Sequence, residues 1–407
     1  MPQQPVVLDP ASNDRHAEHQ VLRARGPAAR VVILGVDAWA VTSPTLLREL
    51  LNSDYVSKDG RRHWPEFDRA VRDWPLALWV AVENMFTAYG GDHRRLRRLV
   101  APALTARKVA PLTAHIEQLV HGLLDELDRT APSEPVDLRD RFAYPLSIEV
   151  ISHLMGLPAD QQQPFRRCVD AVFSTTLTAE QEDANAAALY GILDALITNK
   201  RRRPGDDLTS HLIAARDVEG DGSALSEGEL RDTLLLMVSA GYETTVNVID
   251  QAVTALLVHP AQRLHIRNGR ATWEDVVEET LRLEPAAKHM PLRFALRDIS
   301  LPGGQVIAKG DAILASFAAA NRHPNWYERP DEFDITRAAQ DHLAFGHGVH
   351  FCLGAPLARL EVATALRALF ERFPDLRLAT PAEQLRPLAS LISNGHREVP
   401  VFLHAAA

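Results

Sequence analysis

Cysteine is scarce in this chain, since Cys168 and Cys352 are the only two among 407 residues. Two thiols cannot build the disulfide framework of a small secreted domain, so we expect a reducing, cytoplasmic location. Long apolar runs are missing as well. The run 234–240 falls well short of the roughly 18 residues that span a bilayer. Residues 1–20 are polar and contain neither the apolar core of a signal peptide nor an anchor. The sequence therefore predicts no membrane segment.

Positive charge is in deficit, because 44 lysines and arginines face 53 acidic residues, for a formal net charge of −9. This balance argues against a nucleic-acid binder. Hydrophobic residues make up 46% of the chain and charged residues 24%, which is ordinary for a globular protein with a large buried core. Cys168 lies in a helical stretch and is interpreted as a small buried side chain.

The hydrophobic pattern predicts a mainly α fold with small β-sheets, formed as one domain over 1–407, with 1–20 as a flexible N-terminal segment. Residues 30–41 indicate a β-hairpin, because two apolar runs flank a Gly-Asp turn signal. Ser226 and Glu229 form a capping-box pattern that opens a helix of about 30 residues, uninterrupted by proline until Pro260. One more long helix is expected over about 355–372.

Residues 345–354, with the sequence FGHGVHFCLG, contain the strongest signal for chemistry. Three glycines in ten residues permit tight turns and the close approach of a flat ligand. Cys352 stands just before the helix predicted at 355, where free amides and the positive end of the helix dipole favour a thiolate. Cys352 is therefore a candidate for a soft, anionic metal ligand.

Two alternatives apply to this loop. His342, His347, His350 and Cys352 contain zinc-ligand types, but their spacing matches no zinc pattern, and HExxH is absent. An inert buried cysteine would be the natural interpretation of an isolated residue. The surrounding glycines argue against it.

The spacing Phe345-x-x-Gly348-x-His350-x-Cys352-x-Gly354 resembles the haem-binding signature of the cytochrome P-450 superfamily, and weaker similarity extends from about residue 20 to the end. The likeness is greatest to the actinobacterial, ferredoxin-dependent group. It implies a cytochrome P-450 fold with haem b between the long helix and the cysteine loop. Cys352 is then the iron ligand, and a thiolate on haem iron promotes O–O cleavage. His350 is implied as a partner of a haem propionate. Further implied haem contacts are Phe345, Gly346, Gly354 and, on the long helix, Ala240.

The long helix contains Ala240-Gly241-Tyr242-Glu243-Thr244-Thr245. Glycine inside a helix costs about 1 kcal/mol relative to alanine, so Gly241 needs a reason. It either leaves room for a ligand or allows another helix to pack closely. The segment is similar to the oxygen-activating helix of the family, which implies Glu243 and Thr244 as a proton-relay pair and Gly241 as a spacer.

Charged pairs elsewhere match the family as well. Glu279 and Arg282 stand three apart on one helix face, and resemblance implies a structural pair completed by Arg337. His93, Arg97 and Arg293 are implied to bind haem propionates. The basic face formed by Arg94, Arg95 and Arg98 is a candidate docking surface for an acidic, ferredoxin-type donor.

The resemblance implies a monooxygenase that inserts one atom of O2 into a C–H bond of a hydrophobic molecule such as a steroid or flavonoid. Electrons would come from NAD(P)H through a reductase and ferredoxin. The rivals are a peroxide-driven peroxygenase and a haem protein that only binds ligands; neither needs an acid-alcohol pair. The expected lining of the substrate pocket is Val80, Met85, Phe86, Leu236, Ala240, Ala287, His289, Met290 and Ile392, although plain core packing is the alternative for each apolar member.

Overall fold

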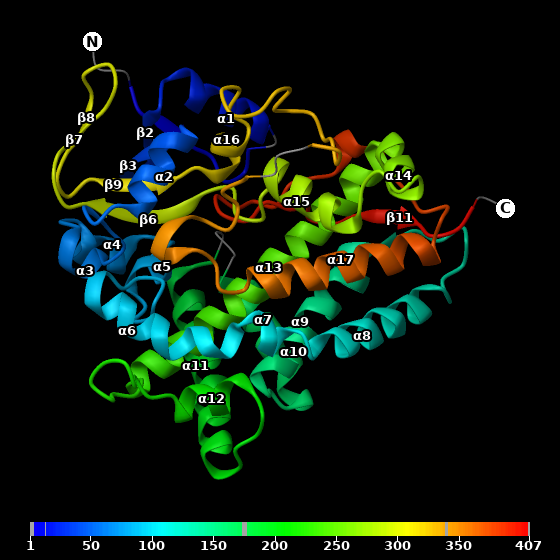
Figure 1. The fold of residues 1–407 in the computed structure, drawn as a ribbon, viewed down its shortest axis with the longest axis horizontal. Helices are drawn as coiled ribbons and strands as arrows, with labels where there is room; N and C mark the ends of the chain where they lie inside the picture. The colour runs from blue at the N-terminus through cyan, green and yellow to red at the C-terminus, as the bar shows by residue number, and fades with distance from the viewer. Residues whose placement is uncertain (1–3, 13, 173–176, 338–340, 406–407) are drawn as a thin grey trace.

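The computed structural model describes residues 4–12, 14–172, 177–337 and 341–405, and it confirms a helix-rich fold with small sheets (Figure 1). The longer helices are α1 (Arg15–Ala24), α2 (Pro44–Asn52), α6 (Gly90–Val100), α8 (Leu112–Leu127), α9 (Tyr144–Met155), α10 (Ala159–Val172), α11 (Ala179–Arg202), α13 (Glu227–Val258), α14 (Pro260–Arg267), α15 (Trp273–Leu283) and α17 (Ala355–Arg372). Shorter helical segments are α3 (Gly60–His63), α4 (Phe67–Asp73), α5 (Leu78–Ala81), α7 (Ala106–Val109), α12 (Leu208–Ala214), α16 (Phe317–Asn321), η1 (Ala101–Leu104), η2 (Arg139–Ala143), η3 (Gly348–His350) and η4 (Ala382–Gln384).

The largest sheet has six strands in the order β1-β2-β3-β9-β6-β4. Its strands are β1 (Val6–Leu8), β2 (Ala28–Ile33), β3 (Val36–Val41), β9 (Ala312–Ala315), β6 (Met290–Ala295) and β4 (Val56–Ser57). The β2–β3 pair is antiparallel, which confirms the hairpin predicted over 30–41. The segment 1–20, for which flexibility was expected, contains β1, paired in parallel with β2, and the first turns of α1.

Two smaller sheets complete the β structure. One has the order β10-β11-β5, formed by β10 (Arg377–Leu378), β11 (Pro400–Phe402) and β5 (Val136–Asp137). The other pairs β7 (Ile299–Ser300) with β8 (Val306–Ile307). Figure 1 places the six-stranded sheet at one side of the molecule and the long helices at the other. The candidate site includes the cysteine loop, residues 345–354, which directly precedes α17.

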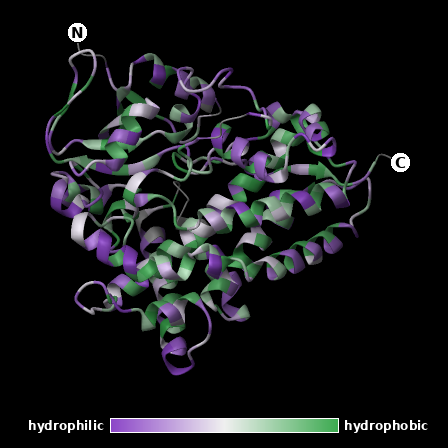
Figure 2. Ribbon diagram, in the orientation of Figure 1, coloured by the Kyte–Doolittle hydropathy of each residue, from purple (hydrophilic) through white to green (hydrophobic). Residues whose placement is uncertain are grey.

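Helix α13 runs through the centre of the helical part. Its first turn is closed by the predicted capping box, in which Ser226 accepts from the N–H of Glu229 and the Glu229 side chain accepts from the N–H of Ser226. Most of its residues are buried, and it packs against α9, α15 and α17. Amphipathic helices surround it, and Figure 2 shows hydrophobic and hydrophilic residues alternating along α8 and α17. Among the described helices, none is both long and apolar enough to cross a membrane.

Candidate haem-thiolate site

The cysteine loop turns sharply between β9 and α17 and is closed by a hydrogen bond of 3.0 Å from the N–H of Cys352 to the carbonyl of Phe345. Gly348 has φ +69°, and a Cβ atom there would lie 2.6 Å from the carbonyl oxygen of Leu51. Only glycine fits this position, because a side chain would be strained and would collide with the backbone of the last turn of α2. The predicted need for glycine in the loop therefore has a concrete cause at Gly348.

Cys352 remains accessible to solvent, although the surrounding protein affects its thiol. Burial raises the pKa of its thiol, while the N–H groups of Gly354 and Ala355, at the start of α17, act in the opposite direction. The guanidinium groups of Arg97 and Arg359 also lower it. The helix terminus thus favours the thiolate, as the sequence indicated, but burial outweighs it in the protein alone. A bound metal cation would add the positive charge that a thiolate requires.

Four basic side chains that the resemblance assigned to propionates, His93, Arg97, Arg293 and His350, converge beside the loop. The rings of His93 and His350 lie 4.1 Å apart between centroids, and a guanidinium nitrogen of Arg97 donates to the carbonyl of Phe351 at 2.8 Å. Burial, and then the charge of Arg97, lowers the pKa of His93 to about 4. Burial lowers the pKa of Arg293 to about 10, and it also holds the pKa of His350 well below its usual value, aided by neighbouring cations.

Lys58 joins these residues and was missed by the sequence analysis. Its side chain is buried, and its Nζ lies 3.3 Å from the carbonyl of Pro291 and 3.5 Å from the centroid of the Phe86 ring. Burial, followed by the charge of Arg293, holds its pKa well below the usual value. No sequence motif marks Lys58, because it is a single lysine before a short helix and no residue at helical spacing pairs with it. We call the group of His93, Arg97, Arg293, His350 and Lys58 the cationic cluster.

The cationic cluster fits an anionic ligand. Among the described residues, no member of it forms an ion pair with a carboxylate, and the buried atoms His93 Nε2 and Arg293 Nη1 have no hydrogen-bond partner. Buried charges are normally paired, because an unpaired one carries a large desolvation cost. The two propionates of a haem would supply the missing negative charge. The residues present therefore fit the group that the resemblance implies.

One face of α13 is less buried than the rest of the helix. Leu236 and Thr244 are partly exposed and Ala240 is exposed, although the residues around them on the helix are mostly buried. These three stand four residues apart, so they form one stripe along the helix. The Thr244 hydroxyl donates to the carbonyl of Ala240 one turn back, the local hydrogen bond expected for a threonine in a helix interior.

The interpretation of Gly241 as a spacer for a ligand is not supported. A Cβ atom at this position would lie 3.0 Å from Cδ1 of Ile151 in α9. The missing side chain therefore allows α13 and α9 to approach each other, which is the packing alternative raised from the sequence. The physical reason is the 100° turn between neighbouring residues, which directs position 241 away from the stripe that contains Ala240 and Thr244.

Glu243 is buried and ion-paired, which the sequence did not indicate. Its Oε1 lies 3.1 Å from Nη2 of Arg139, and Nη1 of Arg139 lies 3.0 Å from Asp250. Asp250 in turn accepts from the backbone N–H of His396 and contacts its ring Nδ1 at 2.6 Å. We call Arg139, Glu243, Asp250 and His396 the Arg139 network. This network joins η2, α13 and the C-terminal segment. Glu243 can carry a proton only if its carboxylate first separates from Arg139.

Glu279, Arg282 and Arg337 lie together. The Arg282 guanidinium contacts both oxygens of Glu279, at 2.7 and 2.9 Å, and Nε of Arg337 lies 3.0 Å from Glu279 Oε1. The side chains of Glu279 and Arg282 are fully buried. Further donors on Arg282 and Arg337 bind carbonyl groups of the segment 321–332, so this triad ties α15 to the long loop before Cys352.

The residues expected to form a substrate pocket separate into two groups. Phe86 and Leu236 line one cavity, together with Leu78, Trp79, Val82, Asn84, Leu235 and Ser239. Val80, Ala287 and Ile392 are buried in the apolar core beside the six-stranded sheet, with Met290 packed against it, and Met85 is buried in the helical core. His289 is engaged elsewhere, since its ring nitrogens contact Ser316 and Glu18.

The three arginines of the expected basic face differ in their surroundings. Arg95 is ion-paired with Glu229, and Arg98 with Asp217 at 2.7 Å. Arg94 is exposed and forms no ion pair with any residue that the structure describes. Intramolecular carboxylates therefore neutralise two of these three cations, which leaves Arg94 as the one of the three whose charge is available to a partner.

The zinc alternative for the cysteine loop finds no geometric support. His342 Nε2 lies 3.2 Å from Glu278, on the side of α15, and His350 packs on His93. Within the described ranges, the histidines of the loop and Cys352 do not form a group with ligand atoms close enough for one ion.

Comparison with known proteins gives consistent results. The family model described as "Cytochrome P450" matches residues 272–387. The 2-hydroxy-5-methyl-1-naphthoate 7-hydroxylase of Streptomyces carzinostaticus is 40% identical and aligns over 99% of this chain and 98% of its own length. The vitamin D(3) 25-hydroxylase of Pseudonocardia autotrophica is 36% identical, with 95% of this chain and 93% of that protein covered. The structure of CYP154A1 from Streptomyces coelicolor A3(2) superposes with a TM-score of 0.93 at 62% identity, over 98% of this chain and 100% of the other.

Proposed function

The chain belongs to the cytochrome P-450 family of oxygen-incorporating oxidoreductases, and we propose that it hydroxylates a hydrophobic small molecule with electrons delivered by a ferredoxin. The observation that carries this proposal is the pairing of an accessible Cys352 with a cluster of basic side chains, of which Lys58, His93 and Arg293 are buried, that has no carboxylate partner among the described residues. A haem b satisfies both features at once, because it offers an iron for the thiol sulphur and two anionic propionates.

In this proposal Cys352 Sγ holds the iron and the cationic cluster holds the propionates. Bound haem supplies the activation of dioxygen, which no side chain of the protein can perform. The stripe of Leu236, Ala240 and Thr244 on α13 lies over the reacting region. Thr244 Oγ accepts and passes a proton there, and Glu243 replenishes it when its carboxylate leaves Arg139.

Substrate binding is assigned to the cavity lined by Phe86, Leu236 and their neighbours. Its mostly apolar lining supports a weakly polar substrate of the steroid, flavonoid or natural-product type over a highly charged one. Two of the relatives described above carry names of hydroxylases for an aromatic acid and for vitamin D(3), which is consistent with an apolar ring system.

The absorption spectrum of the reduced protein under carbon monoxide tests the proposal. Wild-type protein should show the red-shifted Soret band of thiolate ligation, and Cys352→Ser should lose it while retaining bound haem. Cys168→Ser is the matched control, because Cys168 is buried in α10 and should leave the band unchanged. A haem-loaded wild type without the band would overturn thiolate ligation.

The proton relay is tested separately by Thr244→Ala. A monooxygenase that relies on this hydroxyl should continue to consume NAD(P)H, but release most of the electrons as hydrogen peroxide. Thr245→Ala is the control, since Thr245 makes the same type of bond, to the carbonyl of Gly241 at 3.0 Å, from a buried position on the helix. Fully coupled product formation by Thr244→Ala would remove this role from the hydroxyl.

A further inference from the structure

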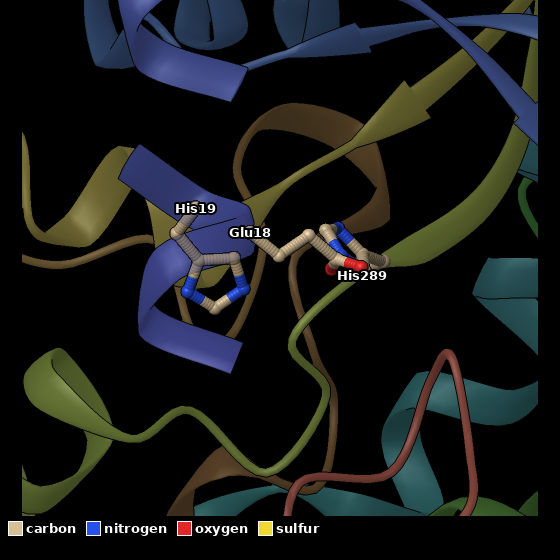
Figure 3. A group of neighbouring side chains, drawn as sticks. All are labelled: Glu18, His19 and His289. Carbon is tan, nitrogen blue, oxygen red and sulfur yellow. The ribbon is translucent and has the colours of Figure 1, made fainter. Parts of the chain in front are cut away.

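A second cluster of ligand-type side chains lies away from the cysteine loop, where α1 meets the six-stranded sheet. Glu18 and His19 belong to α1, and His289 stands directly before β6 (Figure 3). Each residue offers one ligand atom, and these atoms all lie within 4.8 Å of one another. No part of the proposed oxygenation uses these side chains.

His19 is the unusual member of the cluster. Its side chain is buried, with 3% of the residue exposed, and neither ring nitrogen has a hydrogen-bond partner in the described structure. A buried imidazole without any partner is costly, so an unpaired one calls for a bound water or ion. Figure 3 shows the Glu18 carboxylate against the His289 ring, with the His19 ring on the other side of the Glu18 side chain, and the three ligand atoms lie within 4.8 Å of one another.

His289 is already oriented as a ligand. Its Nδ1 lies 3.1 Å from the hydroxyl of Ser316, and its Nε2 lies 3.3 Å from Glu18 Oε1. With the proton on Nδ1 and donated to Ser316, Nε2 presents a lone pair toward Glu18 and His19. Metal-binding histidines commonly have their second ring nitrogen fixed by such a hydrogen bond.

We propose that Glu18, His19 and His289 bind a divalent transition-metal ion of the zinc type. Two imidazoles and one carboxylate, with water in the fourth position, form a common tetrahedral zinc set. Calcium and magnesium prefer oxygen ligands and are disfavoured by the two nitrogens.

The charges around the cluster set limits on the affinity. The basic side chains near His19 include Lys288, Arg322 and His16. Arg322 is neutralised by Glu284 and Asp331, and His16 is mostly exposed, whereas Lys288 is buried next to His289. The Glu18 carboxylate is therefore essential to the site, because it is the negative ligand that offsets Lys288. A bound ion would fasten α1 to the strand β6.

Equilibrium dialysis of the haem-loaded protein against Zn²⁺, followed by metal analysis, tests the site directly. After treatment with EDTA, wild type should bind about one zinc ion per chain. His19→Ala should lose at least tenfold in affinity, and Glu18→Gln should lose a similar amount. The matched control is His16→Asn, which removes an exposed histidine from the same helix and should bind zinc as wild type does. Equal binding by wild type and His19→Ala, or no binding by wild type, would overturn the proposal.

Thermal stability gives a second measurement that holds even if one variant folds poorly. Zinc at about one hundred times its dissociation constant should raise the Tm of wild type by about 3 °C, and leave that of folded Glu18→Gln unchanged. An unchanged wild-type Tm at that zinc concentration would contradict the proposed metal site. Because zinc binding and Tm are recorded without turnover, their failure leaves the proposed monooxygenase function untouched.

Discussion

Two groups of charged or basic side chains, the Glu279 triad and the cationic cluster, differ in whether the chain itself supplies their counter-charge. The triad of Glu279, Arg282 and Arg337 carries its counter-charge within the chain, and each donor has a partner. The cationic cluster contains basic side chains and no carboxylate, and it retains unpaired atoms on His93 and Arg293. The triad is complete in the folded chain, so its charges serve the fold. The cluster is complete only with an anion, so its charges serve a ligand.

The largest effect should come from breaking the triad. Glu279→Gln leaves Arg282 charged, fully buried and without its carboxylate, which typically costs about 3–5 kcal/mol. Denaturation by urea should show this loss, and little folded protein is expected at 37 °C. Glu332→Gln is the control, because the Glu332 carboxylate pairs with Arg329 at the exposed surface and is worth under about 1 kcal/mol. Similar losses in both variants would mean that burial does not distinguish the two pairs.

The Arg139 network predicts a smaller loss with a clear dependence on pH. Burial raises the pKa of Asp250, but contacts with His396 and then Arg139 outweigh it and hold that pKa below the usual value. Asp250 therefore contributes stability above the unfolded pKa of 3.8, and this contribution is lost as the pH falls through the lower folded value.

Arg139→Met should destabilise the protein by about 3 kcal/mol at pH 7 and move the onset of acid unfolding to higher pH. Chemical denaturation at several pH values measures both effects. Arg166→Met is the control, since Arg166 also lies over the Tyr144 ring but pairs with Asp140, which is largely exposed. If acid unfolding of Arg139→Met began at the same pH as in wild type, the low pKa of Asp250 would not depend on the Arg139 guanidinium.

These residues also show what a sequence alone can reveal. The loop around Cys352, the capping box of α13 and the hairpin were predictable because each has a local signature. Arg337 was implied by the family resemblance and lies 3.0 Å from Glu279. Arg139 and Lys58 were not found, because their significance arises from contacts with residues distant in sequence. The close approach of Gly241 to Ile151 likewise depends on how α13 and α9 pack, which the sequence does not show.

Lys58 allows the ligand side of the comparison to be tested. If the cluster pairs with propionates, Lys58→Met removes one of these contacts, and haem should transfer to apomyoglobin about tenfold faster, which corresponds to about 1.4 kcal/mol. Lys309→Met, at an exposed position, should transfer haem at the wild-type rate. Slower transfer from Lys58→Met would instead mean that the buried ammonium is a desolvation cost that no propionate offsets.

The smallest effect concerns charge at the surface, where the same distinction between paired and unpaired cations applies. Arg95 and Arg98 are held by Glu229 and Asp217, so the expected docking of an acidic ferredoxin depends chiefly on Arg94. Arg94→Glu should raise the KM for ferredoxin about threefold at low salt, with kcat unchanged, and the difference should shrink as ionic strength rises. Arg270→Glu, in the exposed turn between α14 and α15, should leave KM unchanged. If both reversals have the same effect, the donor responds to net charge and not to the face of α6 that contains Arg94.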